Sequence, residues 1–155
     1  KSLAFGSKSS TSGHLMPRHY LSTQFQLDVA TDLAGAPVYS GAHDATAKIV
    51  ESGKVAAGAL NKQVWERLVA TGVIDTTKVG VIWTTPSYVD YVWTARTGVP
   101  KTQRDAFAKA FMDLDGSDPA HAAVLELQGA QRFLAGSPED FDIIESVAKS
   151  TGLLK

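Results

Sequence analysis

Short apolar runs alternate with helix-like segments along the first part of the chain. The runs cover residues 3–5, 37–39, 55–60 and 79–83, and small or polar residues separate each run from the segment that follows it. This alternation is typical of α/β proteins, in which strands and helices follow one another and the strands form a parallel sheet. The pattern therefore predicts an α/β fold with a parallel sheet.

The segments between these runs have recognisable helix boundaries. Helices are expected over residues 14–21 and 45–52, and Gly53 stands where a glycine commonly ends a helix. Asn61 is expected to cap the next helix, which ends at Gly72, because its side-chain oxygen can accept a hydrogen bond from an unpaired backbone N–H.

The pattern changes after Pro86, beyond which no further strand is expected. Amphipathic helices are expected instead over residues 102–114, 119–128 and 138–148. Asp118 directly precedes the second of these helices and can cap it. Three helices without a strand of their own must pack either on the sheet or on another part of the protein.

Composition and charge exclude several classes of protein. The chain has 155 residues, of which 44% are apolar and 20% charged, close to the average for globular proteins. The 15 Lys and Arg residues nearly balance the 16 Asp and Glu residues and are not clustered, so no nucleic-acid partner is expected. The absence of cysteine excludes disulfides and thiolate metal ligands. No long apolar run and no export signal is visible, so the chain as given is expected to be soluble.

Hydroxyl groups are concentrated in the loop after the first strand, at Ser10, Thr11 and Ser12. In a parallel sheet, ligands bind beyond the carboxyl ends of the strands, where loops lead into helix N-termini with unpaired N–H groups. Such a turn suits a tetrahedral oxyanion, and Gly13 lets the backbone approach it closely. The alternative is that Ser10 or Ser12 only caps the following helix.

Two further polar residues follow later strands and are expected at the same edge of the sheet. His43 can donate a hydrogen bond to the same anion, or it can be a surface or capping histidine. Asp90 can accept a hydrogen bond only from a ligand oxygen that keeps its proton, so it would select protonated oxyanions. The alternative for Asp90 is a loop aspartate that binds turn amides.

Enzymatic and metal-binding alternatives have less support. The serine turn, His43 and Asp90 can in principle form a hydrolase triad, but the sequence has no G-x-S-x-G elbow and no base within the serine loop. His14 and His19 lie five residues apart, a spacing that does not place two metal ligands on one helix face. We therefore expect no enzyme activity, no metal and no cofactor.

Four motifs follow one another along the chain, and they resemble those of a known family. The motifs are FGSKSSTSGHLMPR at 5–18, GAHDA at 41–45, AGALN at 57–61 and VIWTTP at 81–86, the last followed by Asp90 and Trp93. Together they resemble the phosphonate, phosphite and phosphate substrate-binding proteins of bacterial ABC importers. Residues 132–154 also resemble the C-terminus of that family.

The resemblance implies a type II periplasmic-binding-protein fold, in which two α/β lobes clamp a ligand between them. Residues 1–86 are expected to form one ligand-binding α/β lobe. Residues 87–155 are expected to be the crossover and a helical C-terminal segment that belongs to the other lobe, whose N-terminal part this sequence lacks. The residues that the resemblance assigns to the phosphorus oxyanion are Ser10, Thr11, Ser12, His43 and Asp90.

The resemblance also implies a function and a location. A protein of this kind binds a small phosphorus oxyanion (a phosphonate, phosphite or related species) and delivers it to a membrane permease. It acts in the periplasm or, as a membrane-anchored lipoprotein, outside the cell. An alternative is an oxyanion sensor that signals to a membrane partner. Apolar surface on the last three helices is expected to meet the second lobe or, without it, to promote self-association.

Overall fold

The computed structural model describes residues 1–154 and divides into two compact units. The first unit comprises residues 1–90 together with 141–155, and the second comprises residues 91–140. Each unit is described by itself.

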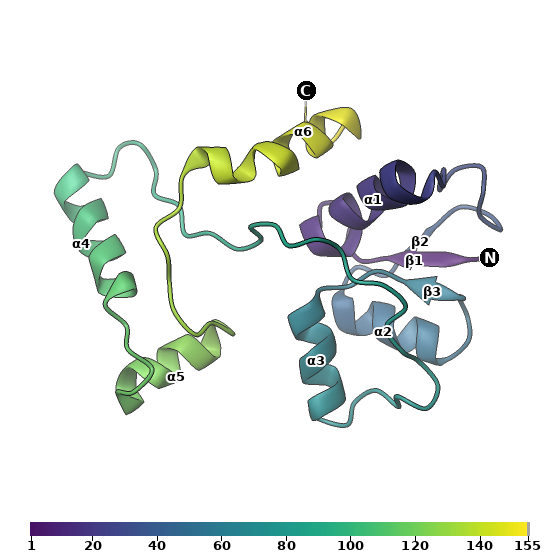
Figure 1. Cartoon of the computed structure of the whole chain (residues 1–155), viewed down its shortest axis with the longest axis horizontal. Coiled ribbons are helices and arrows are strands. Elements are labelled where there is room, and N and C mark those ends of the chain that lie inside the picture. Colours follow the sequence, from purple (N-terminus) through teal and green to yellow (C-terminus); the bar gives the residue numbers. More distant parts are fainter. Residues whose placement is uncertain (155) are drawn as a thin grey trace. The chain divides into compact units, whose positions relative to one another are not determined.

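A small parallel sheet lies at the centre of the first unit (Figure 1). Its strands are β1 (Leu3–Phe5), β2 (Val38–Tyr39) and β3 (Ala57–Gly58), in the order β2-β1-β3. Both neighbours pair with β1 in parallel. The alternation of strands and helices in the sequence therefore gives the expected parallel α/β arrangement.

Helices cover both faces of this sheet. The chain leaves β1 through a π-helical turn, η1 (Thr11–Leu15), and continues as α1 (Met16–Phe25). After β2 it forms α2 (His43–Glu51), and after β3 it forms α3 (Lys62–Ala70). Figure 1 shows α1 on one side of the sheet and α2 on the other. This placement follows from right-handed crossovers, because the chain moves from β1 to β2 in one direction and from β2 to β3 in the other.

The expected helix ends in this unit are confirmed. Asn61 caps α3, since its side-chain oxygen accepts a hydrogen bond from the Val64 N–H at 3.2 Å. Gly53 and Gly72 lie just beyond the ends of α2 and α3 with φ of 73° and 67°, a left-handed conformation that favours glycine.

Two apolar clusters hold the helices in place. Leu15 and Met16 bury against Val147 and Ala148 of the last helix, α6 (Asp142–Ser150). Ala47 of α2 packs with Leu68 of α3 and with Ile74 in the following loop. The sheet itself contributes Ala4 and Phe5, which are fully buried.

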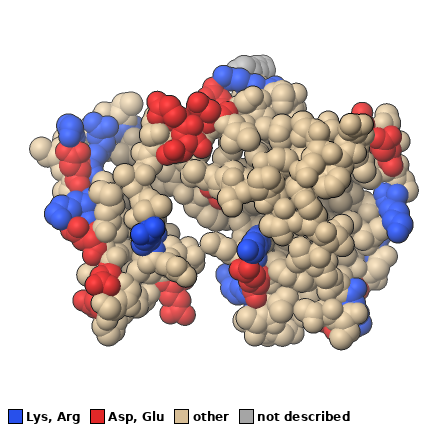
Figure 2. Space-filling model, viewed as in Figure 1, with Lys and Arg blue, Asp and Glu red and all other residues tan. Residues whose placement is uncertain are grey.

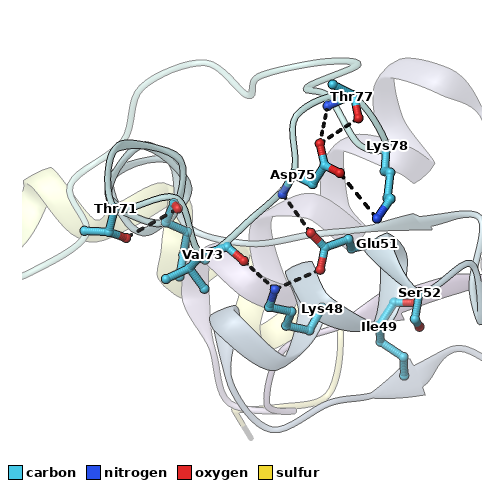
Figure 3. A network of polar contacts seen from close by, with 10 residues as sticks. Lys48, Ile49, Glu51, Ser52, Thr71, Val73, Asp75, Thr77 and Lys78 are labelled. Atoms are coloured by element: carbon cyan, nitrogen blue, oxygen red, sulfur yellow. Dashed lines mark hydrogen bonds and ion pairs between the residues drawn. The ribbon is translucent and has the colours of Figure 1, made fainter.

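A polar network fastens the end of α2 to the loop after α3 (Figure 3). Lys48 binds Glu51 at 2.8 Å and also donates to the Val73 carbonyl. Glu51 in turn accepts a hydrogen bond from the Asp75 N–H at 2.7 Å. Because of the Lys48 and Asp75 hydrogen bonds, the pKa of Glu51 is lowered. The loop is thus tied to α2 through Lys48 and Glu51, and a further ion pair between Asp75 and Lys78 at 3.3 Å lies within the loop itself.

The prediction of a strand at residues 79–83 is wrong for the described chain. This segment has no regular secondary structure, and Val81 and Ile82 are 59% and 89% exposed. A strand needs a ladder partner for its N–H and C=O groups, and neither edge of the three-stranded sheet supplies one to this segment within residues 1–154. Its apolar, β-branched residues therefore form no strand in the described chain.

The second unit is helical, as expected after Pro86. It contains α4 (Lys101–Met112) and α5 (Pro119–Leu127), and it ends in the 3₁₀ turn η2 (Pro138–Phe141) at its boundary with the first unit. Asp118 caps α5, because its carboxylate accepts a hydrogen bond from the Ala120 N–H at 2.8 Å. Four aromatic rings of this unit contact one another, namely Trp93, Phe107, Phe111 and Phe133. The cluster is only partly covered, since Trp93 and Phe107 remain 57% and 52% exposed.

The division into units differs from the boundary expected at Pro86. The first unit extends to Asp90, and residues 141–155 are grouped with it rather than with residues 91–140. The physical reason is the burial of Val147 and Ala148, which are 2% and 4% exposed. The assignment of residues 87–155 to a second lobe of a larger clamp stays a prediction.

Acidic and basic side chains are interspersed on the face drawn in Figure 2. This distribution agrees with the near balance of charges in the sequence. Over residues 1–154, none of the helices has the length and apolar character needed to cross a bilayer.

Candidate functional site

The carboxyl ends of β1 and β3 define the position of the candidate site. β1 lies at the centre of the sheet, and its crossover leads to β2 on one side while β3 lies on the other. The loops that follow β1 and β3 therefore diverge to opposite faces of the sheet. This is the topological switch point, where open α/β sheets bind their ligands. Ser12 follows β1 and Asn61 follows β3, and the two side chains meet there at 3.5 Å.

The serine turn after β1 is a tight structure built around two glycines. The Ser10 hydroxyl accepts a hydrogen bond from the Gly13 N–H at 2.9 Å, so Ser10 caps the turn, which was one of the two roles that the sequence allowed. The Gly6 N–H donates to the Gly13 carbonyl at 2.8 Å and closes the loop. A Cβ atom on Gly13 would lie 2.9 Å from the Ser10 hydroxyl and 3.0 Å from His43 Cε1, so any other residue here would have to displace these two side chains.

Asn61 is the residue that connects the site. Its side-chain nitrogen donates to Asp90 Oδ2 at 2.9 Å and lies 3.5 Å from the Ser12 hydroxyl. Its backbone N–H donates to His43 Nδ1 at 3.2 Å. Asn61 is only 8% exposed, so these contacts are largely shielded from water. Three of the predicted site residues are thus joined through one side chain and one peptide group.

His43 is the first residue of α2, and its ring edge faces the serine turn. Burial lowers the pKa of His43 below the usual 6.5, and the nearby Asp90 and Asp44 carboxylates partly oppose this effect. The ring is therefore neutral at pH 7. Among residues 1–154 no hydrogen bond to its Nε2 atom is found, so this nitrogen is free to meet a ligand.

The structure brings together most of the residues predicted for the site. Ser12, His43 and Asp90 are linked through Asn61, and Ser10 shapes the same turn. Thr11 lies between the two serines, and its hydroxyl has no hydrogen bond within the described residues. For Asn61 the sequence predicted only a role as a helix cap. Its position directly after a strand was the one signal for a role in the site.

The arrangement is not that of a Ser-His-Asp triad. Asp90 binds the Asn61 amide, and the His43 nitrogen that a triad would give to the aspartate is occupied by the Asn61 N–H. No serine hydroxyl hydrogen-bonds to His43 in the described part of the chain. The group can donate and accept hydrogen bonds, but it has no activated nucleophile.

His14 has a structural role, as its position inside the fold indicates. Its Nδ1 atom contacts the Lys8 carbonyl at 2.7 Å, and its Nε2 atom contacts the Tyr39 hydroxyl at 3.1 Å. Burial lowers the pKa of His14, although the hydrogen bond to Lys8 opposes the shift. No group of three or more His, Cys, Asp or Glu residues between residues 1 and 154 is arranged to hold a metal ion.

A shallow depression adjoins the site between α2 and α3. His43 and Asp44 line it from α2, and Arg67 lines it from α3. A larger open depression lies along α2, lined by Lys48, Lys54 and other residues, but it contains none of the residues that meet around Asn61. The hydrogen-bonded group at the switch point, rather than the larger depression, is therefore the candidate site.

Comparison with known proteins agrees with this geometry. A sequence model of the phosphonate-binding periplasmic substrate-binding proteins of ABC transporters matches residues 1–141. The chain belongs to this family. Its parallel sheet with covering helices is accordingly that of a type II periplasmic-binding fold.

A curated relative and a solved structure extend the comparison. A probable phosphite-binding ABC transporter protein, PhnD1 of Prochlorococcus marinus (strain MIT 9301), is 34% identical over 155 aligned residues, which cover 97% of this chain and 52% of that protein. The 1.52 Å structure of PhnD1 in complex with methylphosphonate superposes with a TM-score of 0.88 at 32% identity. That match covers 99% of this chain and 57% of the other. The chain thus spans about half the length of the relatives that it matches.

Proposed function

We propose that this chain forms the ligand-binding part of a substrate-binding protein that delivers a small phosphorus oxyanion to the permease of an ABC importer. The family and the PhnD1 complex with methylphosphonate support the ligand class. The observation that carries the proposal is the meeting of Ser12, His43 and Asp90 around Asn61 at the switch point. The protein acts by binding and release rather than by catalysis, in the periplasm or outside the cell.

The chemistry of the proposed site fits a compact anion. Hydroxyl groups of the serine turn and the neutral His43 ring donate hydrogen bonds to anionic oxygens. Asp90 accepts a hydrogen bond from an oxygen that keeps a proton, and so it disfavours a fully deprotonated ligand. In this proposal residues 91–140 belong to the segment that returns to a second lobe, which covers the ligand when the clamp closes.

Titration calorimetry on the full natural gene product tests the proposal, with methylphosphonate, phosphite and phosphate as ligands and sulfate as a control. Asp90→Ala is expected to weaken binding by about 10- to 100-fold, because a hydrogen bond to a charged group contributes about 1.5–3 kcal/mol. Asp105→Ala is the matched control, since Asp105 lies on α4 and pairs with the exposed Lys101. Absence of binding by the natural protein, or unchanged affinity of Asp90→Ala, would contradict the proposal.

A further inference from the structure

Asn61 is held in one orientation by the helix that it caps. The Val64 N–H can only donate a hydrogen bond, so the Asn61 atom that it meets at 3.2 Å must be the amide oxygen. The amide nitrogen then points the other way, toward Asp90 and Ser12. A cap at the start of α3 thereby sets the direction of a donor in the site.

The two hydrogens of this nitrogen decide what its neighbours can offer to a ligand. One is donated to Asp90 Oδ2 at 2.9 Å, which leaves Oδ1 as the open acceptor of that carboxylate. The other is directed at the Ser12 oxygen, at the weaker distance of 3.5 Å. Since the Ser12 oxygen accepts on that side, its own hydrogen is free to be donated elsewhere.

The backbone N–H of the same residue decides the protonation of His43. A peptide N–H can only donate, so His43 Nδ1, at 3.2 Å, must accept and carries no hydrogen. The hydrogen of the neutral ring is therefore on Nε2, which is open. His14 shows the opposite case, because the Lys8 carbonyl can only accept and so Nδ1 of His14 carries the hydrogen.

We propose that Asn61 is a positioning residue of this site, which holds His43 as the Nε2–H tautomer and fixes Asp90 and Ser12 so that the site presents two donors and one acceptor. The inference rests on the proposed function. It deepens that function, because two donors and one acceptor complement an oxyanion that bears at least one P–OH group. A ligand with no proton to donate leaves the Asp90 oxygen unmatched.

The tautomer is tested without any ligand. A long-range ¹H–¹⁵N spectrum of the imidazole rings in the natural protein at neutral pH is expected to show His43 as Nε2–H and His14 as Nδ1–H. His14, which is expected to be the opposite tautomer, serves as the internal reference. A His43 ring found as Nδ1–H, or as an even mixture, overturns the proposal. This result does not depend on whether phosphonates bind.

The side-chain role is tested with Asn61→Asp, which keeps an oxygen to cap Val64 but removes the donor. Methylphosphonate affinity at pH 7.5 is expected to fall about 10- to 100-fold, and to recover in part at lower pH as the new carboxyl group takes up a proton and can donate again. The other charged or titratable groups around the site are His43, Asp44 and Arg67. The His43 tautomer is expected to stay the same, because the backbone N–H is retained.

Asp118→Asn is the matched control, since it makes the reverse exchange at the cap of α5. It is expected to leave the affinity unchanged. Wild-type affinity with an unshifted pH profile in Asn61→Asp overturns the positioning role. If the natural protein binds none of the phosphorus oxyanions, the proposed function fails, and the tautomer spectrum still decides the part of the inference that concerns His43.

Discussion

Individual residues at this site act through the direction of their hydrogen bonds. Asn61 accepts on the helix side and donates on the site side, so a residue that the sequence assigned to capping also organises the polar group. Ser10 shows the reverse, because the residue predicted as a ligand donor also caps its own turn. In both cases the residue type indicated a polar role but not the partner, since an amide and a hydroxyl can each donate as well as accept a hydrogen bond.

Buried His14 and half-buried His43 are expected to make the stability of the protein depend on pH. Burial lowers the pKa of His14 and of His43 below 6.5. An unfolded chain therefore takes up protons on these rings at a higher pH than the folded chain does, and acid favours unfolding. Their contribution to stability is complete above pH 6.5 and is lost as the pH falls below that value.

Urea unfolding at pH 7.5, 6.5 and 5.5 is expected to show falling midpoints. His14→Gln is expected to flatten this dependence, because the glutamine amide can bind the Lys8 carbonyl and the Tyr39 hydroxyl without titrating. The lowered pKa values of Glu51 and Asp75 start from 4.5 and 3.8, so their effects belong to a more acidic range. An equally steep dependence in His14→Gln would contradict the assignment to that ring.

At the scale of elements, the strands are short and the helices carry most of the packing. β3 has two residues, and it is held against α2 by close contact at Gly58. A Cβ atom on Gly58 would lie 2.6 Å from Thr46 Cγ2 and 2.9 Å from Val50 Cγ2. Both neighbours are β-branched residues on a helix, whose side chains have little rotational freedom.

Gly58→Ala is therefore expected to reduce the free energy of unfolding by about 1–3 kcal/mol, as overpacking of a close contact does. Urea denaturation measures this loss. Gly80→Ala is the control, because a Cβ atom on Gly80 would meet nothing within 4 Å and the φ of this glycine is not positive. That substitution is expected to be neutral or slightly stabilising. Equal losses in the two variants would argue against a steric cause.

One secondary-structure element was predicted wrongly from the local sequence pattern. Residues 79–83 have the apolar, β-branched composition of a strand, but they have no ladder partner in the described chain. Strand formation depends on a neighbour distant in sequence, whereas a helix forms its hydrogen bonds within four residues. The boundaries of the helices were accordingly predicted to within a few residues, whereas the prediction of a fourth strand was wrong.

At the scale of the whole molecule, the chain exposes large apolar side chains within the run from residue 81 to residue 93. The most exposed are Val81, Ile82, Tyr91, Val92 and Trp93. Soluble monomers rarely leave so many neighbouring apolar residues open to water. The expectation of self-association, or of cover by another lobe, therefore extends from the last helices to this segment.

The 155-residue chain by itself is expected to associate as its concentration rises, which sedimentation velocity measures. Ile82→Glu is expected to weaken the association, since Ile82 is 89% exposed and would then carry a charge. Thr76→Glu adds the same charge at an exposed polar position nearby and serves as the control. A chain that stays monomeric at every concentration, or equal effects of the two substitutions, would contradict this prediction.

Much of this protein follows from the sequence alone. The alternation of strands and helices, the caps at Asn61 and Asp118, and the hydroxyl-rich turn depend on residues within a few positions of one another, so local physics determines them. The motifs also identified the family, which the comparison confirms.

The tertiary structure decided the rest, because it depends on contacts between residues far apart in the chain. Asn61 meets His43, Asp90 and Ser12 across separations of 18, 29 and 49 residues. No local pattern specifies which atom of an amide faces which of these partners, or that the last helix packs beside the first. Such contacts form only when the order of strands in the sheet brings their loops to one edge, and the hydrogen-bond directions that define the site arise there.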